Sequence, residues 1–147
     1  PAPDTFDCLR ENTVGLENVH LRCEALGAVH CGVSIVDDAS RRGNTGARFV
    51  ASDEASEEGV GAGATMVCLD ELWILDLDLL KLDVEGCELF ALQGASQTIL
   101  NCRPVVVMEV KRLGSGRQDP ELAVKQLISL GYEEVERRGN DRIYLPH

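Results

Sequence analysis

The chain has few basic and aromatic residues and no long apolar run. Lys and Arg number 14 against 25 Asp and Glu, giving a net charge of −11, and aromatic residues make up 4%. Such a field repels phosphate backbones and anionic lipid surfaces, so we expect neither nucleic acid nor a membrane as a partner. No stretch of about 18 apolar residues and no signal peptide is visible, which excludes a membrane-spanning helix from the expected structure.

Paired metal-binding residues are also missing. The six cysteines are scattered without a C-x-x-C pair, and there are only three histidines, so the spacing of a zinc site is absent. Several of the cysteines sit in apolar patterns, where free Cys behaves as a small buried hydrophobe. These features predict a reducing, cytoplasmic environment without disulfides.

What is present is an ordinary globular composition. With 147 residues and 44% hydrophobic residues, the chain suits a single domain over residues 1–147, and a domain of this size buries roughly 68–70% of its unfolded surface. It opens at Pro1 without a methionine and enters a helical pattern by Asp4, as expected of a sequence joined midway.

Hydrophobic periodicity and turn residues divide the chain into alternating elements. Strands are predicted at 19–25, 33–36, 47–50, 65–68, 79–84, 104–110, 132–136 and 142–145, and helices from Asp4, at 88–100 and at 120–130. A short helical or irregular piece is expected at 69–75. Strand, helix, strand, helix and a closing hairpin predict a parallel sheet with helices on its faces and an antiparallel edge. The continuous apolar run at 104–110 is typical of a strand covered on both faces.

The most informative stretch begins at Leu79. An apolar strand ends in Asp83 and Glu85, and Gly86 then turns the chain into a helix. Residues two apart along a strand share a face, so both carboxylates should point the same way. The next strand ends at Glu109. Ligands of open α/β sheets bind at the carboxyl ends of the strands, and no cationic residue directly follows the first pair, which indicates a functional role.

Structural alternatives stand beside these functional ones. Glu85 could cap the following helix, where an acid is favourable, and Glu88 is more typical of such a capping residue. Lys81 could pair with an acid on a neighbouring strand, and Trp73 is more often a core or lid residue than a substrate platform. The glycine cluster at 59–63 follows an acidic run instead of a strand, so we interpret it as a flexible loop and not a phosphate loop.

Residues 81–95, KLDVEGCELFALQGA, resemble the signature of the FkbM-type methyltransferases, K-I-D-V-E-G-x-E-x-x-x-L-x-G-A. Arg103-Pro104 with the apolar strand after it, Gly131-Tyr132, the closing residues 140–144 and the opening P-x-P-x-x-F pattern are also similar to that family. The resemblance implies an α/β fold: a mostly parallel, Rossmann-like class I methyltransferase sheet with a C-terminal antiparallel hairpin. The family's first strand, glycine-rich cofactor loop and second strand would precede Pro1, so the fold is expected to be truncated at the N-terminus.

The same resemblance implies S-adenosylmethionine as cofactor and methyl transfer to a small-molecule or sugar hydroxyl. The implied catalytic residues are Asp83, Glu85 and Glu109, one of which would take the acceptor's proton or bind the acceptor; a divalent metal shared with Glu109 is an alternative. The residues that would contact the cofactor are Cys23, Glu24 and Ala25. The second hypothesis is a non-catalytic remnant or interaction module, with a homodimer covering the unpaired strand.

Overall fold

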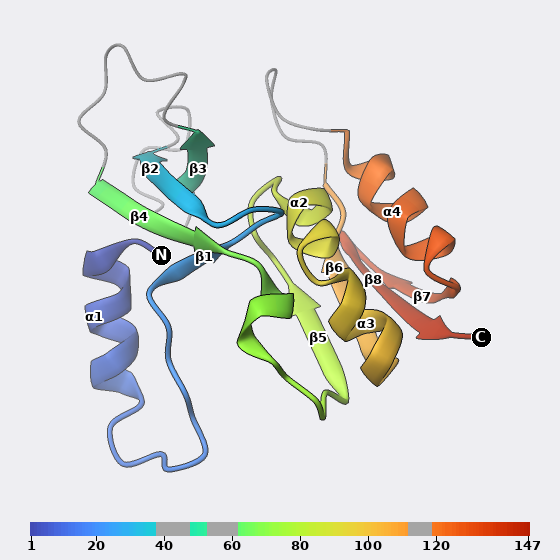
Figure 1. The fold of residues 1–147 in the computed structure, drawn as a ribbon, viewed down its shortest axis with the longest axis horizontal. Coiled ribbons are helices and arrows are strands. Elements are labelled where there is room, and N and C mark those ends of the chain that lie inside the picture. Colours follow the sequence, from blue (N-terminus) through green and yellow to red (C-terminus); the bar gives the residue numbers. More distant parts are fainter. Residues whose placement is uncertain (38–47, 53–61, 112–118) are drawn as a thin grey trace. The chain divides into compact units, whose positions relative to one another are not determined.

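The computed structural model describes residues 1–37, 48–52, 62–111 and 119–147. Figure 1 shows its elements along the chain. In order they are α1 (Pro3–Asn12), β1 (Glu24–Leu26), β2 (Cys31–Asp37), β3 (Arg48–Ser52), β4 (Ala62–Val67), the 3-10 turn η3 (Leu69–Leu72), β5 (Leu79–Leu82), α2 (Glu88–Gln93), α3 (Ser96–Cys102), β6 (Val105–Glu109), α4 (Pro120–Ser129), β7 (Tyr132–Arg138) and β8 (Asp141–Pro146). None of the described helices is long and apolar enough to cross a lipid bilayer.

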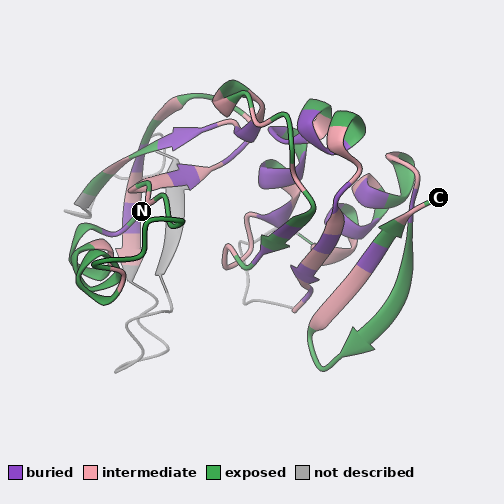
Figure 2. Cartoon of the chain, turned by 90° about the horizontal axis from the view of Figure 1, so that it is seen from below, coloured by how far each residue is buried: buried purple, intermediate pink, exposed green. Residues whose placement is uncertain are grey.

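The chain separates into two compact units, one formed by residues 1–25 and 30–66 and the other by residues 26–29 and 67–147. The prediction of one domain over the whole chain stays a prediction. The first unit has a small core in which Ala25, Val33 and Met66 are buried. Its helix α1 buries none of its own side chains, and Figure 2 shows this helix mostly in the colour of exposed residues.

Each of the two sheets has four strands. The order in the first is β1-β4-β2-β3, and in the second β5-β6-β8-β7. The register pairs β2 with both β3 and β4 in antiparallel fashion. In the second sheet β5 and β6 are parallel, with Leu79 opposite Val105, whereas β8 runs antiparallel to β6 and to β7. The C-terminal hairpin is therefore confirmed, but the prediction of a mostly parallel sheet is wrong, because the pairs β2–β3, β2–β4, β6–β8 and β7–β8 are all antiparallel.

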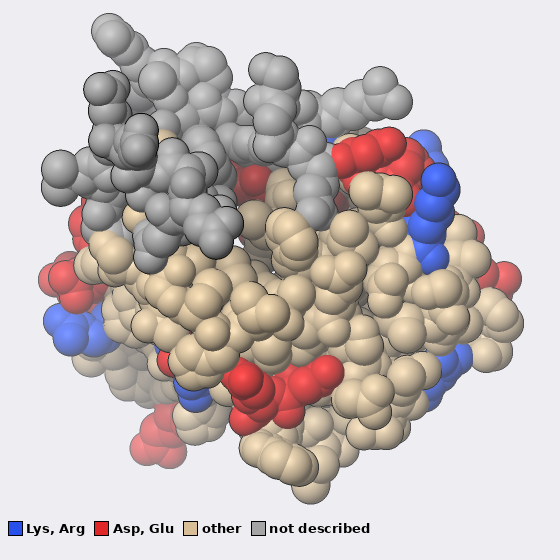
Figure 3. Space-filling view, turned by 45° about the horizontal axis from the view of Figure 1, so that its top comes forward, with Lys and Arg blue, Asp and Glu red and all other residues tan. Residues whose placement is uncertain are grey.

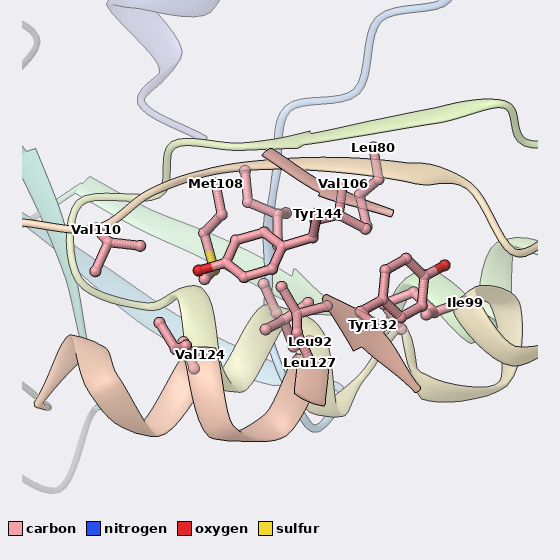
Figure 4. Packing of buried hydrophobic residues seen from close by; sticks show 14 of the residues in the cluster. Leu80, Leu92, Ile99, Val106, Met108, Val110, Val124, Leu127, Tyr132 and Tyr144 are labelled. Atoms are coloured by element: carbon pink, nitrogen blue, oxygen red, sulfur yellow. The ribbon is translucent and has the colours of Figure 1, made fainter. Parts of the chain in front are cut away.

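The main core lies between the second sheet and helices α2, α3 and α4. Leu92, Ile99, Val106, Met108, Leu127 and Tyr144 are each 0% exposed. Figure 4 shows Val124 and Leu127 of α4 beside Met108 and Tyr144 of the strands. Burying a side chain of this size stabilises the fold by about 1.5–3 kcal/mol. This cluster fixes β5 and β6 against the helices, and thereby fixes where their carboxyl ends lie.

Strand β6 is fully covered on one face only. Val106 and Met108 are inaccessible, whereas Val105 and Val107, which point to the other face, are partly exposed. The expectation of a strand covered on both faces is therefore met in full on one face and in part on the other. Within this unit the described helices all contribute to one cluster and so cover a single face of the sheet.

Two predicted elements differ strongly from the structure in length or continuity. The strand predicted at 19–25 is reduced to β1, which begins at Glu24, because alternation of side chains alone does not supply a backbone partner. The helix predicted at 88–100 is two helices that meet at Gly94 and Ala95. The second of these, α3, receives its cap from elsewhere in the chain. Asp70 of η3 accepts hydrogen bonds from the N–H groups of Gln97 (3.1 Å) and Thr98 (2.8 Å) and from the Thr98 hydroxyl (2.8 Å).

Candidate active site

The turn after β5 is held by the helix that follows it. The strand ends at Leu82, and Glu85 (φ 50°) and Gly86 (φ 99°) both have left-handed backbone conformations. The Glu88 carboxylate is buried and accepts hydrogen bonds from the N–H groups of Val84 (3.3 Å) and Gly86 (3.2 Å). An acid at the start of a helix is also favoured by the helix dipole. These bonds hold the turn before α2, and the N-cap of α2 has no side-chain hydrogen bond, so the interpretation of Glu88 as a helix-capping residue stays a prediction.

Asp83 and Glu85 do not lie on a strand. The expectation that both leave one face of the strand is therefore wrong, because the regular backbone stops at Leu82 and the chain turns at Glu85. Asp83 is exposed, and it makes no hydrogen bond or ion pair with the part of the chain that the structure describes. It is thus a carboxylate at the carboxyl end of β5 that the fold leaves uncommitted.

Lys111 joins the two remaining carboxylates. Its Nζ lies 2.6 Å from Oε2 of Glu109 and 3.2 Å from Oε2 of Glu85, with all three side chains only 18–20% exposed. Both of these oxygens are buried. Burial alone would lower the pKa of the Lys111 ammonium, but its bonds to Glu109 and Glu85 outweigh this and raise the pKa above the ordinary value of 10.5. The structure therefore brings Glu85 and Glu109 together around a cation.

This arrangement leaves Lys111 where a shared metal ion would have to lie. No group of three or more His, Cys, Asp or Glu side chains suited to a metal is found among the described residues. The Lys111 ammonium offsets one of the two carboxylate charges. A divalent metal shared with Glu109 stays a prediction.

Cys23, Glu24 and Ala25, which the resemblance implies for the cofactor, lie in the first unit. The last two belong to β1. Ala25 is buried in that unit's small core. The Cys23 thiol donates to the carbonyl of Pro1 (3.5 Å), and the Glu24 carboxylate is paired with Arg22, which lowers the pKa of Glu24. None of the three presents an uncommitted polar group for a ribose, and their role stays a prediction. Of the glycine cluster, residues 59–61 lie outside the described residues, and Gly63 belongs to β4.

Most of the described basic side chains form ion pairs with acidic side chains of the same chain. Lys81 of β5 forms an ion pair with Asp141 of β8 (3.3 Å). The sequence predicted a pair with an acid on a neighbouring strand, but β6 lies between these two strands. On the face drawn in Figure 3, Lys and Arg form small separate groups and no continuous basic surface. The expected absence of nucleic acid and membrane partners stays a prediction.

Sequence reasoning missed two residues of this region. One is Lys111, which comes two positions after Glu109, and the alternation of a strand could have placed it near that carboxylate. The other is Asp70, whose carboxylate caps α3 from a distance of 27 residues along the chain. No local pattern could have revealed this second contact, because the acceptor and the donors meet only in the folded unit.

The second unit is an α/β unit in which acidic residues follow β5 and end β6, two parallel strands. The model of the methyltransferase FkbM domain matches residues 1–134. The chain therefore belongs to the FkbM methyltransferase family. Searches of curated proteins and of solved structures found no match.

Proposed function

We propose that this chain acts as an S-adenosylmethionine-dependent methyltransferase on a hydroxyl of a small molecule or sugar. The observation that carries the proposal is the uncommitted carboxylate of Asp83, held at the carboxyl end of β5 inside the family's signature. A cytoplasmic location belongs to the same proposal and is supported by the six free cysteines.

The cofactor, when bound, supplies an electrophilic methyl group on a sulfonium. The chain's own part is to hold the acceptor hydroxyl in line with that methyl group and to take its proton as the new oxygen–carbon bond forms. Asp83 is suited to the proton because no ion pair with the described residues competes for it. Glu85 and Glu109 are suited to positioning, because both hold Lys111.

The charge of the site indicates which kind of acceptor it would bind. Two carboxylates and one ammonium leave the Lys111 cluster with one net negative charge, and Asp83 adds another nearby in the chain. A neutral, hydroxyl-rich acceptor fits such a site better than a phosphorylated or carboxylated one. The proposal therefore favours a neutral sugar or alcohol as the acceptor.

Calorimetric titration of S-adenosylmethionine into the full-length gene product tests the proposal. Binding of one cofactor per chain, followed by methyl transfer to a panel of neutral sugars and alcohols, is the expected result. A folded protein that binds no cofactor would refute it, and a circular dichroism spectrum establishes the folding. Lys111→Met is titrated in parallel, because it removes the cation between Glu85 and Glu109 and leaves Asp83 unchanged.

A non-catalytic interaction module is the second candidate, and the position of β5 favours it. Among the described strands β5 pairs only with β6, so the N–H and C=O groups of its other edge have no described strand partner. Such an edge is a template for pairing with a second chain. The opposite edge, β7, is protected by charged residues and by a bulge between Glu134 and Glu136. Light scattering between micromolar and millimolar chain concentrations tests a homodimer, and a monomer throughout would count against it.

A further inference from the structure

The segment that leads into β5 exposes large apolar side chains. Trp73 is 82% exposed, Leu75 is 84% exposed, and Leu79, the first residue of β5, is 56% exposed. We call these three residues the Trp73 patch. Figure 1 shows the segment between η3 and β5. Side chains of this size expose on the order of 100–200 Å² each, so the three residues together expose a few hundred Å² of apolar surface within one short segment.

The exposure of the patch is fixed by its neighbours in the chain. Leu72, Ile74 and Leu77 alternate with it and pack against the main core. The Cys102 thiol donates to the carbonyl of Ile74 (3.6 Å). The carbonyl of Asp78 accepts from the N–H of Val105 (2.8 Å). A backbone anchored at both ends therefore presents Trp73 and Leu75 outward.

Trp73 is also held in an uncommon backbone conformation. Its φ of 53° lies in the left-handed region, which costs a residue with a side chain on the order of 1 kcal/mol. A tryptophan whose role was to pack in the core would be buried. The only tryptophan of the chain is instead exposed and strained. Strain at an exposed aromatic residue points to a function outside the core.

The charges beside the patch select its partner. Asp76 and Asp78 are exposed and make no ion pair within the part of the chain that the structure describes. The sequence contains no Lys or Arg from residue 49 to residue 80. A tryptophan ring attracts cations through its face, and neighbouring carboxylates add to that attraction.

We propose that the Trp73 patch docks a segment of another protein in which Arg or Lys side chains flank apolar ones. The apolar side chains of the partner cover Leu75 and Leu79, and its cations meet Asp76, Asp78 and the Trp73 ring. A second copy of this chain fits less well, since each copy carries a net charge of −11. An anionic lipid surface is repelled for the same reason. This inference does not depend on catalysis.

The single tryptophan makes the test direct, because its fluorescence reports on the patch alone. The probe is a dansyl-labelled peptide of twelve alternating arginine and leucine residues, and the control probe has glutamate in place of arginine. With the full chain at 150 mM salt, the arginine peptide is expected to shift the tryptophan emission to shorter wavelength, and the glutamate peptide is not. Dansyl anisotropy gives the Kd.

Variants separate the patch from general acidity. Leu75→Ser and Trp73→Ser are expected to weaken binding about tenfold or more, as truncation at the centre of an interface does, and Asp76→Lys at least threefold. The matched controls are Ile128→Ser, at a residue 55% exposed on α4, and Glu17→Lys, an exposed site in the other unit with the same change in charge. Both should stay within about twofold if the patch and not the net charge of the chain decides binding, because Glu17→Lys and Asp76→Lys change the net charge equally.

Three results would overturn the inference. One is equal binding of the glutamate peptide, and another is an equal loss of affinity in Glu17→Lys and Asp76→Lys. The third is an emission shift that depends on protein concentration without any peptide, which would assign the patch to a second copy of the chain. Circular dichroism of each variant shows that a loss of binding does not reflect loss of the fold.

Discussion

Gly94 lies where α2 ends, and its lack of a side chain is required by a close backbone contact. A Cβ added there would lie 1.9 Å from the carbonyl oxygen of Gly27 and 3.3 Å from the Cα of Cys68. Its own backbone, with φ −77° and ψ −1°, is one that alanine adopts without strain. Gly94→Ala therefore isolates the cost of the contact from any cost of backbone conformation.

The expected loss of stability follows from what must move. Overpacking costs about 1–3 kcal/mol when side chains can adjust, but here both contacts involve backbone. The shift would strain two bonds, from the Gly27 N–H to the Val67 carbonyl (3.0 Å) and from the Asp70 N–H to the Gly94 carbonyl (2.9 Å), each contributing about 1 kcal/mol. Alanine regains up to about 1 kcal/mol through its lower conformational entropy. We expect a net loss of about 2–4 kcal/mol, which lowers Tm by on the order of 10 °C.

Urea unfolding followed by far-ultraviolet circular dichroism measures this loss. Gly63→Ala is the matched control, because Gly63 is exposed, has no atom within 4 Å of an added Cβ and does not have a positive φ. The control should change the free energy of unfolding by no more than about 0.5 kcal/mol. Equal midpoints for the two variants, with equal m-values, would show that the approach of Gly94 to Gly27 does not exist.

Three further variants probe the contacts around the candidate site. Asp70→Ala removes the acceptor of three hydrogen bonds at the start of α3 and should lower the free energy of unfolding by about 2–3 kcal/mol, with Asp70→Asn in between. Arg103→Lys should lower the free energy of unfolding by a similar amount, because lysine cannot replace the planar guanidinium. That group donates to the carbonyls of Leu130 (2.8 Å), Gly131 (2.9 Å) and His147 (2.9 Å). It also lies 5.0 Å from the centre of the Tyr132 ring. Lys111→Met removes the cation between two carboxylates and should cost about 1–3 kcal/mol at pH 7. The pKa of Lys111 is raised above 10.5 in the folded chain. The stability that its ammonium contributes is therefore fully present below pH 10.5 and is lost as the pH rises through the pKa of the folded state. The wild type, but not Lys111→Met, should lose this stability in strong alkali.

Urea midpoints at pH 7 test the first two of these variants, and a series from pH 7 to pH 11.5 tests the third. An Asp70→Ala variant as stable as the wild type would contradict the cap on α3. Parallel pH profiles for the wild type and Lys111→Met would contradict the ion pairs at Glu85 and Glu109.

Elements specified by local chemistry could be predicted from the sequence. Pro120 begins α4 as expected, since proline is tolerated in the first turn of a helix. The turn between β7 and β8 is made by Gly139, whose φ is 64°. The signature from Lys81 to Ala95 led to the family that the domain match then showed.

Features set by contacts distant in sequence could not be predicted in this way. Apolar periodicity runs through Gly94 without a break, and only the approach to Gly27 and the cap from Asp70 divide the helix. The predicted strand ending in Asp83 and Glu85 was too long, because the Glu88 carboxylate draws the backbone of residues 84–86 into a turn. Strand direction also depends on which strands pair, and the sequence of a single strand does not identify its neighbours in the sheet.

The most direct test of the central claim compares methyl transfer by the full-length protein and by its Asp83→Asn variant. Transfer of the labelled methyl group of S-adenosylmethionine to neutral sugars and alcohols is measured together with cofactor affinity. We predict that Asp83→Asn lowers the rate by about 10²–10⁴, the range for loss of a general base, with cofactor affinity and stability unchanged. A variant that transfers methyl groups as fast as the wild type would contradict the assignment of Asp83, and a wild type that transfers none would contradict the proposed function.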